Sequence, residues 1–188
     1  MSGLVEDLQS LYRFKWFKIS AFIFLGGFFI GYDLAFLDFT AVLVPFPYLL
    51  PYLANSLVSA WHSDGFVLAD KLEYVKYTFA EAVIVLGGGV LIGLATVGAL
   101  FILGLSVGTC MPAILEYAEA IVVFRSVVFS IFFTCAMILF GTSGLSLGSS
   151  ILHLIRNTSF KTDRRTYDAF LLGLSFLILS IIIQAIWN

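Results

Sequence analysis

The sequence has little charge. Asp, Glu, Lys and Arg make up 12% of the 188 residues, about half the share that is usual in soluble domains. Apolar residues make up 61%, and the mean hydropathy is +1.04. A soluble fold of this length cannot keep so much apolar surface away from water. The composition therefore excludes a soluble globular protein and predicts an integral membrane protein.

Residues that bind metals or form disulfides are also scarce, with two Cys and two His in the chain. Cys110 and Cys135 lie inside apolar runs, while His62 and His153 fall in different segments. These positions argue against a disulfide framework, a bis-histidine haem and a histidine-rich metal site. The sequence also lacks a glycine-rich phosphate loop with its lysine. We predict a protein that has no cofactor, is not an enzyme and binds no nucleic acid.

The chain instead has long runs without charge, and a membrane-spanning helix needs about 20 apolar residues. The longest run, Ala82 to Leu115, contains 34 residues. The predicted fold is all-α: a polytopic transmembrane helical bundle in the lipid bilayer, with residues 1–188 forming a single domain. The other uncharged runs are 19–32, 39–61, 126–152 and 169–188.

Seven of the ten basic residues fall in two clusters, one before the first run and one before the last. Cytoplasmic loops of membrane proteins hold the excess of Lys and Arg, so both clusters should lie inside. This predicts about five crossings, with the N-terminus inside and the C-terminus outside. Residues 1–18 would form a cytoplasmic amphipathic start, and residues 62–78 an interfacial helix. The clusters are Arg13, Lys15 and Lys18, and Arg156, Lys161, Arg164 and Arg165.

Two layouts satisfy this topology. In the first, residues 40–61 span the membrane and residues 82–115 form one long helix. In the second, 40–61 is a re-entrant segment and 82–115 forms two short spans that fold against each other. One helix of this length would reach about 51 Å, against a hydrocarbon core of about 30 Å. The second layout has a weak point for the break at Gly87, Gly88 and Gly89, whereas the first places more basic charge inside.

Glycine recurs at a spacing of four residues in the apolar runs. In lipid, small residues at this spacing let two helix backbones approach closely. The pairs either pack helices within the chain or form a contact with a second copy or another membrane subunit, and the sequence leaves both open. The four pairs are Gly27 with Gly31, Gly89 with Gly93, Gly104 with Gly108, and Gly144 with Gly148.

Three charged residues lie between the longest run and the next one. Glu116 and Glu119 would share a face on one helix, and Glu119 would approach Arg125 if the chain turns there. Ionisable residues at membrane depth are candidates for a proton or cation relay. The alternative is a set of solvated residues at the membrane interface.

The order of these features resembles the stage II sporulation protein M family. The likeness is carried by a basic start into a glycine-marked span, a double apolar stretch, a second glycine motif at the end of a span, and a basic loop before the last helix. The family's Pro-His-Gly and following Glu are missing from 127–133, so the resemblance assigns no polar site residues to this chain. The four stretches are Arg13 to Tyr32, Tyr74 to Gly108, Gly144 to Gly148, and Arg156 to Arg165 with the terminal helix.

This resemblance implies a helical double stretch at residues 79–115, as in the second layout. It also implies a non-enzymatic scaffold or accessory subunit in the plasma membrane of a bacterium or archaeon. The protein would act through glycine-rich helix packing, as a homo-oligomer or within a larger membrane complex. The alternative function is a transporter or channel for an ion or a small solute, because a broken apolar run is typical of such proteins.

Overall fold

The computed structural model describes residues 14–36, 79–91, 93–117, 120–157 and 162–186, and every element in these ranges is a helix. The all-α prediction is therefore confirmed. Residues 79–87 are helical and continue into a short 3-10 helix, η2 (Gly88–Leu91). The predictions for residues 40–61 and 62–78, and for most of 1–18, lie outside the described residues. The long helices are α2 (Lys15–Phe36), α5 (Leu94–Tyr117), α6 (Ala120–Asn157) and α7 (Arg164–Ile186).

Three of the helices are long and apolar enough to cross a membrane: Lys15–Ala35, Val127–Arg156 and Arg164–Ile183. Each meets the length of about 20 residues that the hydrocarbon core requires. By length and composition they support the prediction of a membrane protein. The helix α2 already begins at Lys15, so Lys15 and Lys18 belong to this helix and not to a separate segment before it.

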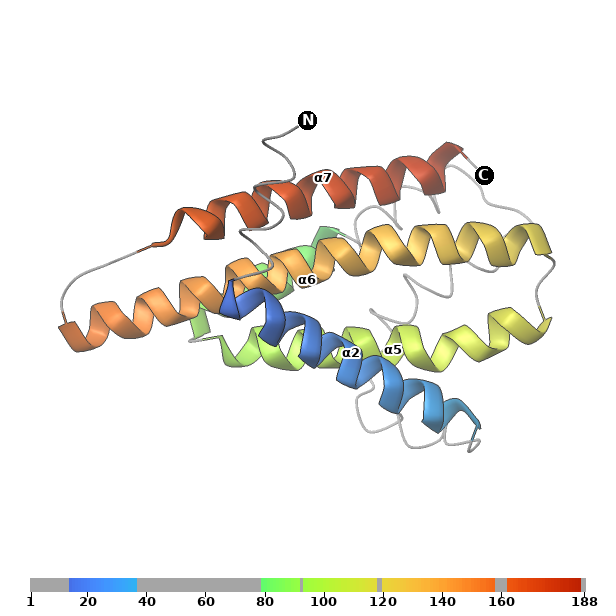
Figure 1. Cartoon of the computed structure of the whole chain (residues 1–188), viewed down its shortest axis with the longest axis horizontal. Coiled ribbons are helices and arrows are strands. Elements are labelled where there is room, and N and C mark those ends of the chain that lie inside the picture. Colours follow the sequence, from blue (N-terminus) through green and yellow to red (C-terminus); the bar gives the residue numbers. More distant parts are fainter. Residues whose placement is uncertain (1–13, 37–78, 92, 118–119, 158–161, 187–188) are drawn as a thin grey trace.

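One of the four long helices runs opposite to the other three. Figure 1 shows that α2, α5 and α7 run one way and that α6 runs the other way. The guanidinium carbon of Arg165 lies 5.9 Å from the centre of the Phe14 ring, so the starts of α2 and α7 are neighbours. Lys15, Lys18 and Arg164 therefore lie at the same end of the bundle, which we call the basic end.

Large side chains from all four long helices fill the interior. Phe24 from α2, Leu100 from α5 and Leu177 from α7 are each at most 1% exposed. They pack in one apolar cluster with α6, where dispersion contacts hold the helices together because lipid provides no hydrophobic drive between them. The α6 members of the cluster include Phe129, Phe133, Ala136, Met137 and Phe140.

The longest uncharged run is not one helix. Helical structure ends at Leu91, Gly93 has a φ of +80°, and α5 begins at Leu94. Glycine adopts a positive φ without a steric penalty, and the chain reverses direction here. The Thr96 hydroxyl consequently donates a hydrogen bond of 2.9 Å to the Val85 carbonyl, across the turn. Of the two alternatives for residues 82–115, the structure has the two folded pieces, which we call the hairpin.

Candidate functional site

Two of the predicted glycine pairs meet each other. Gly27 and Gly31 of α2 face the α5 backbone, while Gly104 and Gly108 of α5 face the α2 backbone. Residue numbers rise together along both helices, so this is a parallel crossing at backbone contact. A Cβ added to any of the four glycines would overlap a carbonyl oxygen of the other helix. The carbonyls belong to Phe101, Leu105, Phe24 and Phe28, in the order Gly27, Gly31, Gly104 and Gly108.

The other two pairs lie where the hairpin meets α6. A Cβ on Gly89 would overlap the Gly144 carbonyl, and one on Gly144 would lie 2.9 Å from the Thr96 hydroxyl. Gly93 lies against Leu145, and Gly148 is also buried. The contacted glycines thus meet backbone or side chains of their own chain, so a second copy would need a different face for its contact.

The predicted charged cluster is divided between elements. Glu116 belongs to the last turn of α5, and Arg125 belongs to the second turn of α6. Glu119 lies outside the described residues, between the end of α5 at Tyr117 and the start of α6 at Ala120. The shared helical face predicted for Glu116 and Glu119 therefore lies partly outside the described residues and stays a prediction. Figure 1 shows that α5 ends and α6 begins at the end of the bundle opposite the basic end, so the last turn of α5 and the first turns of α6 belong to that end.

A different carboxyl group lies inside the bundle. Glu81 is only 4% exposed and is part of the helical segment 79–87, one turn before Val85. Seven α-helical steps and three 3-10 steps separate it from Leu91, which is about 17 Å along the axis. This is about half of a hydrocarbon core of about 30 Å. Because the hairpin turns close to the basic end, Glu81 lies near the middle of the bundle.

Sequence reasoning missed Glu81 because this residue directly precedes the longest uncharged run. On a single helix through residues 82–115 it would mark the entry to the membrane. The break after Leu91 changes its depth, because the first piece is short and Glu81 lies at the far end of this piece from the turn. The three consecutive glycines at 87–89 were the available signal, because they weaken a helix. If the uncharged run turns near them, as it does at Gly93, Glu81 at the start of the run lies in the interior.

The neighbouring helices are apolar at this depth. Leu100 and Leu103 of α5 and Met137 of α6 are at most 1% exposed. Gly141 holds α6 against α5, because a Cβ there would overlap the Leu100 side chain. An ionised carboxylate is costly in such surroundings unless other groups pair with it. Glu81 is thus a buried ionisable group among mainly apolar side chains, which makes it a candidate functional residue.

Buried hydroxyl groups lie on the basic-end side of Glu81, between α6 and α7. The Ser143 hydroxyl donates to the Thr166 carbonyl at 3.0 Å, and the Ser146 and Thr166 hydroxyl oxygens lie 2.6 Å apart. The Ser150 hydroxyl continues this line with a 3.0 Å hydrogen bond to the Ser146 carbonyl. These groups join α6 to α7 and supply donors and acceptors that face the protein interior.

Comparisons of the chain with models of protein families, with curated proteins and with solved structures found no match. The resemblance to the stage II sporulation protein M family accordingly stays a prediction. The glycine contacts, the hairpin and the buried Glu81 are therefore the features of the molecule that bear on function.

Proposed function

We propose that this protein moves a proton or a small cation across a membrane, with the Glu81 carboxylate as the group that binds it. The observation that supports this proposal is the burial of Glu81, which is 4% exposed inside a bundle of membrane-length helices. Intramembrane carboxylates are costly and commonly mark ion or proton pathways. Short, broken helices near the bilayer midplane are a recurring way to build such sites.

The proposed topology has five crossings, with the N-terminus inside and the C-terminus outside. The crossings are α2, the segment that ends at Leu91, then α5, α6 and α7. The contact between Phe14 and Arg165 supports this arrangement, because it brings the basic residues of α2 and α7 to one end of the bundle. An excess of Lys and Arg indicates the cytoplasmic side. The resemblance stated above adds the cell membrane of a bacterium or archaeon as the location.

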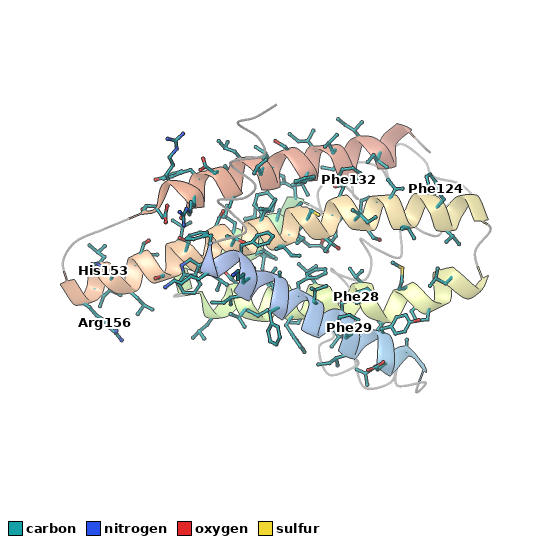
Figure 2. The ribbon with its side chains drawn as sticks, viewed as in Figure 1. Phe28, Phe29, Phe124, Phe132, His153 and Arg156 are labelled. Carbon is teal, nitrogen blue, oxygen red and sulfur yellow. The ribbon has the colours of Figure 1, made fainter. Side chains whose placement is uncertain are left out.

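A non-enzymatic scaffold or accessory subunit is the second candidate, and the end of α6 favours it. This helix has 38 residues, which is about 57 Å against a core of about 30 Å. Figure 2 shows His153 and Arg156 on a part of α6 that extends beyond the other helices, and Ile155 beside them is 67% exposed. Another subunit of a membrane complex would bind here, and a mass above that of the monomer in mild detergent would support this candidate.

The direct test of transport uses the purified protein in liposomes with imposed proton and cation gradients. We expect flux with the native chain and loss of flux with Glu81→Gln, which removes the charge and the proton-binding site but keeps the shape. Glu81→Asp should retain part of the flux, because it keeps the carboxyl group. A pH-sensitive dye inside the liposomes and radioactive sodium measure the two kinds of flux.

Glu116→Gln provides the control, since Glu116 lies on α5 near the end of the bundle. We expect this variant to transport as the native chain does. Flux that persists in Glu81→Gln but disappears in Glu116→Gln would move the site to the cluster predicted from the sequence. The absence of any flux, together with stable copurification of another subunit, would favour the accessory-subunit candidate.

A further inference from the structure

The buried hydroxyl groups continue past Glu81 toward the opposite end of the bundle. Ser106 of α5 is 3% exposed and Ser130 of α6 is 5% exposed. Their hydroxyl oxygens make no hydrogen bond in the part of the chain that the structure describes. A buried hydroxyl without a partner costs roughly 1–3 kcal/mol. Ser20 of α2 and Thr162 before α7 are two more such hydroxyls among the described residues, and Ser106 and Ser130 are the two on α5 and α6, the helices that pack against η2.

The helix rise gives the spacing of these groups along the bundle. The level of the hydrogen bond between the Thr96 hydroxyl and the Val85 carbonyl serves as the reference. Glu81 lies one helical turn, about 6 Å, from this level in the direction away from the basic end. Ser106 lies ten residues beyond Thr96, which is about 15 Å. Gly144 of α6 lies beside Val85 and Thr96, and so it marks the same level of the bundle. Ser130 comes fourteen residues before Gly144, and α6 runs opposite to α5, so Ser130 lies about 21 Å from that level in the same direction as Ser106. The Glu81 side chain points away from the turn, as helical side chains point toward the N-terminus.

These offsets place the polar groups at successive levels along the helix axes of the bundle. On α6, the buried polar residues extend from Ser130 to Ser150, twenty residues or about 30 Å, the thickness of the hydrocarbon core. Between Ser130 and Thr142, this helix contributes Phe133, Met137 and Phe140 to the core. Glu81 and Ser106 lie at the level of this interval, which also contains the half-buried Thr134, and they come from the elements packed against α6.

We propose that the substrate of this site is a proton, which crosses along the series Ser130, Ser106, Glu81 and Thr96 to the Ser146–Thr166 pair. This inference rests on the proposed transport function and specifies its substrate. A metal cation needs about six oxygen ligands at one point, whereas Leu100, Leu103 and Met137 at the level of Glu81 are apolar and at most 1% exposed. A proton needs a single oxygen, and each hydroxyl both donates and accepts a hydrogen bond.

The transfer changes only O–H bonds. A hydroxyl group or water on the Ser106 side gives its proton to the Glu81 carboxylate and takes a replacement proton from the aqueous side beyond Ser130. When Glu81 releases its proton toward Thr96, the accepting hydroxyl or water gives up its own proton toward the Ser146–Thr166 pair, so every O–H bond that forms is matched by one that breaks. No oxidant or reductant takes part. Glu81 is the carboxyl group at mid-depth among the described helices. The other titratable residues on the helices packed against its segment are Cys110, Glu116 and Tyr117 on α5, and Arg125, Cys135, His153 and Arg156 on α6.

The test measures proton flux into liposomes for Ser106→Ala combined with Ser130→Ala. We expect a clear loss of proton flux, because two groups that relay the proton are removed, while folding is preserved because each change removes a single oxygen atom. Ser175→Ala is the matched control, since Ser175 is exposed on α7 and its hydroxyl bonds its own helix at Leu171. This control variant should transport protons as the native chain does.

Each other outcome overturns a defined part of the account. Flux that requires Glu81 but is unchanged in the Ser106 and Ser130 double variant would overturn the hydroxyl series. Sodium flux without proton flux would overturn the proton as substrate and leave the proposed transport function standing. No flux of either kind would overturn the transport function and this inference together.

Discussion

Replacing Gly104 and Gly108 together with Leu should prevent the bundle from assembling. A Cβ at these positions would overlap the carbonyl oxygens of Phe24 and Phe28, which are backbone atoms and cannot rotate away. The two helices must then separate and lose contacts that lipid tails do not replace. Overpacking a core costs about 1–3 kcal/mol for each site, and two adjacent sites on one crossing should exceed the reserve of a small bundle.

Gly98→Leu is the matched control for this variant. Gly98 belongs to the same helix, α5, and is exposed, and an added Cβ there would meet no atom within 4 Å. The new side chain would extend into lipid, and helix propensity would improve by up to about 1 kcal/mol. Thermal unfolding in detergent and the yield of folded protein measure both effects. Equal stability of the double variant and the control would contradict the parallel crossing.

The second large effect is expected for Gly89→Leu. This glycine holds the hairpin against α6, and an added Cβ would overlap the Gly144 carbonyl and lie 2.9 Å from its Cα atom. The hairpin should then leave α6, which would expose Val85, a residue that is 0% exposed in the native chain. The expected loss of stability is about 1–3 kcal/mol, accompanied by loss of the site that contains Glu81.

Gly87→Leu serves as the control in this case, because Gly87 is exposed two residues earlier and has no atom within 4 Å of an added Cβ. A cysteine at position 85 reports on the hairpin through its rate of reaction with a membrane-permeable maleimide. We expect fast labelling in the Gly89→Leu background and slow labelling in the Gly87→Leu background. Slow labelling in both would mean that the hairpin does not depend on the Gly89–Gly144 contact.

The sequence allowed the helices of membrane-spanning length to be predicted, because their length and lack of charge are local properties. The run 126–152 lies within α6, and 169–188 overlaps α7. The spacing of the glycines also identified the residues of both close contacts. Their partners could not be predicted, because a spacing of four residues is the same for a helix of this chain and for a helix of another.

The position of the hairpin turn and the depth of Glu81 could not be predicted from the length of the uncharged run. A run of 34 residues is too long for one span and barely enough for two, so its length does not locate a turn. The turn depends on the φ of +80° at Gly93 and on the Thr96 hydrogen bond to Val85, which joins residues eleven positions apart. Without the turn, the depth of Glu81 is undefined, and its place in the bundle could not be inferred.

The most direct test of the account is a disulfide between positions 85 and 96, because the hairpin places Glu81 inside the bundle. Val85→Cys and Thr96→Cys, with Cys110 and Cys135 replaced by Ala, should cross-link on mild oxidation. A disulfide requires Cα atoms closer than about 7 Å, and one continuous helix would hold these positions about 16 Å apart. Ser146→Cys with Thr166→Cys is the positive control, since these hydroxyl oxygens lie 2.6 Å apart. The account predicts that both pairs close within one chain, and closure of the control pair alone would contradict it.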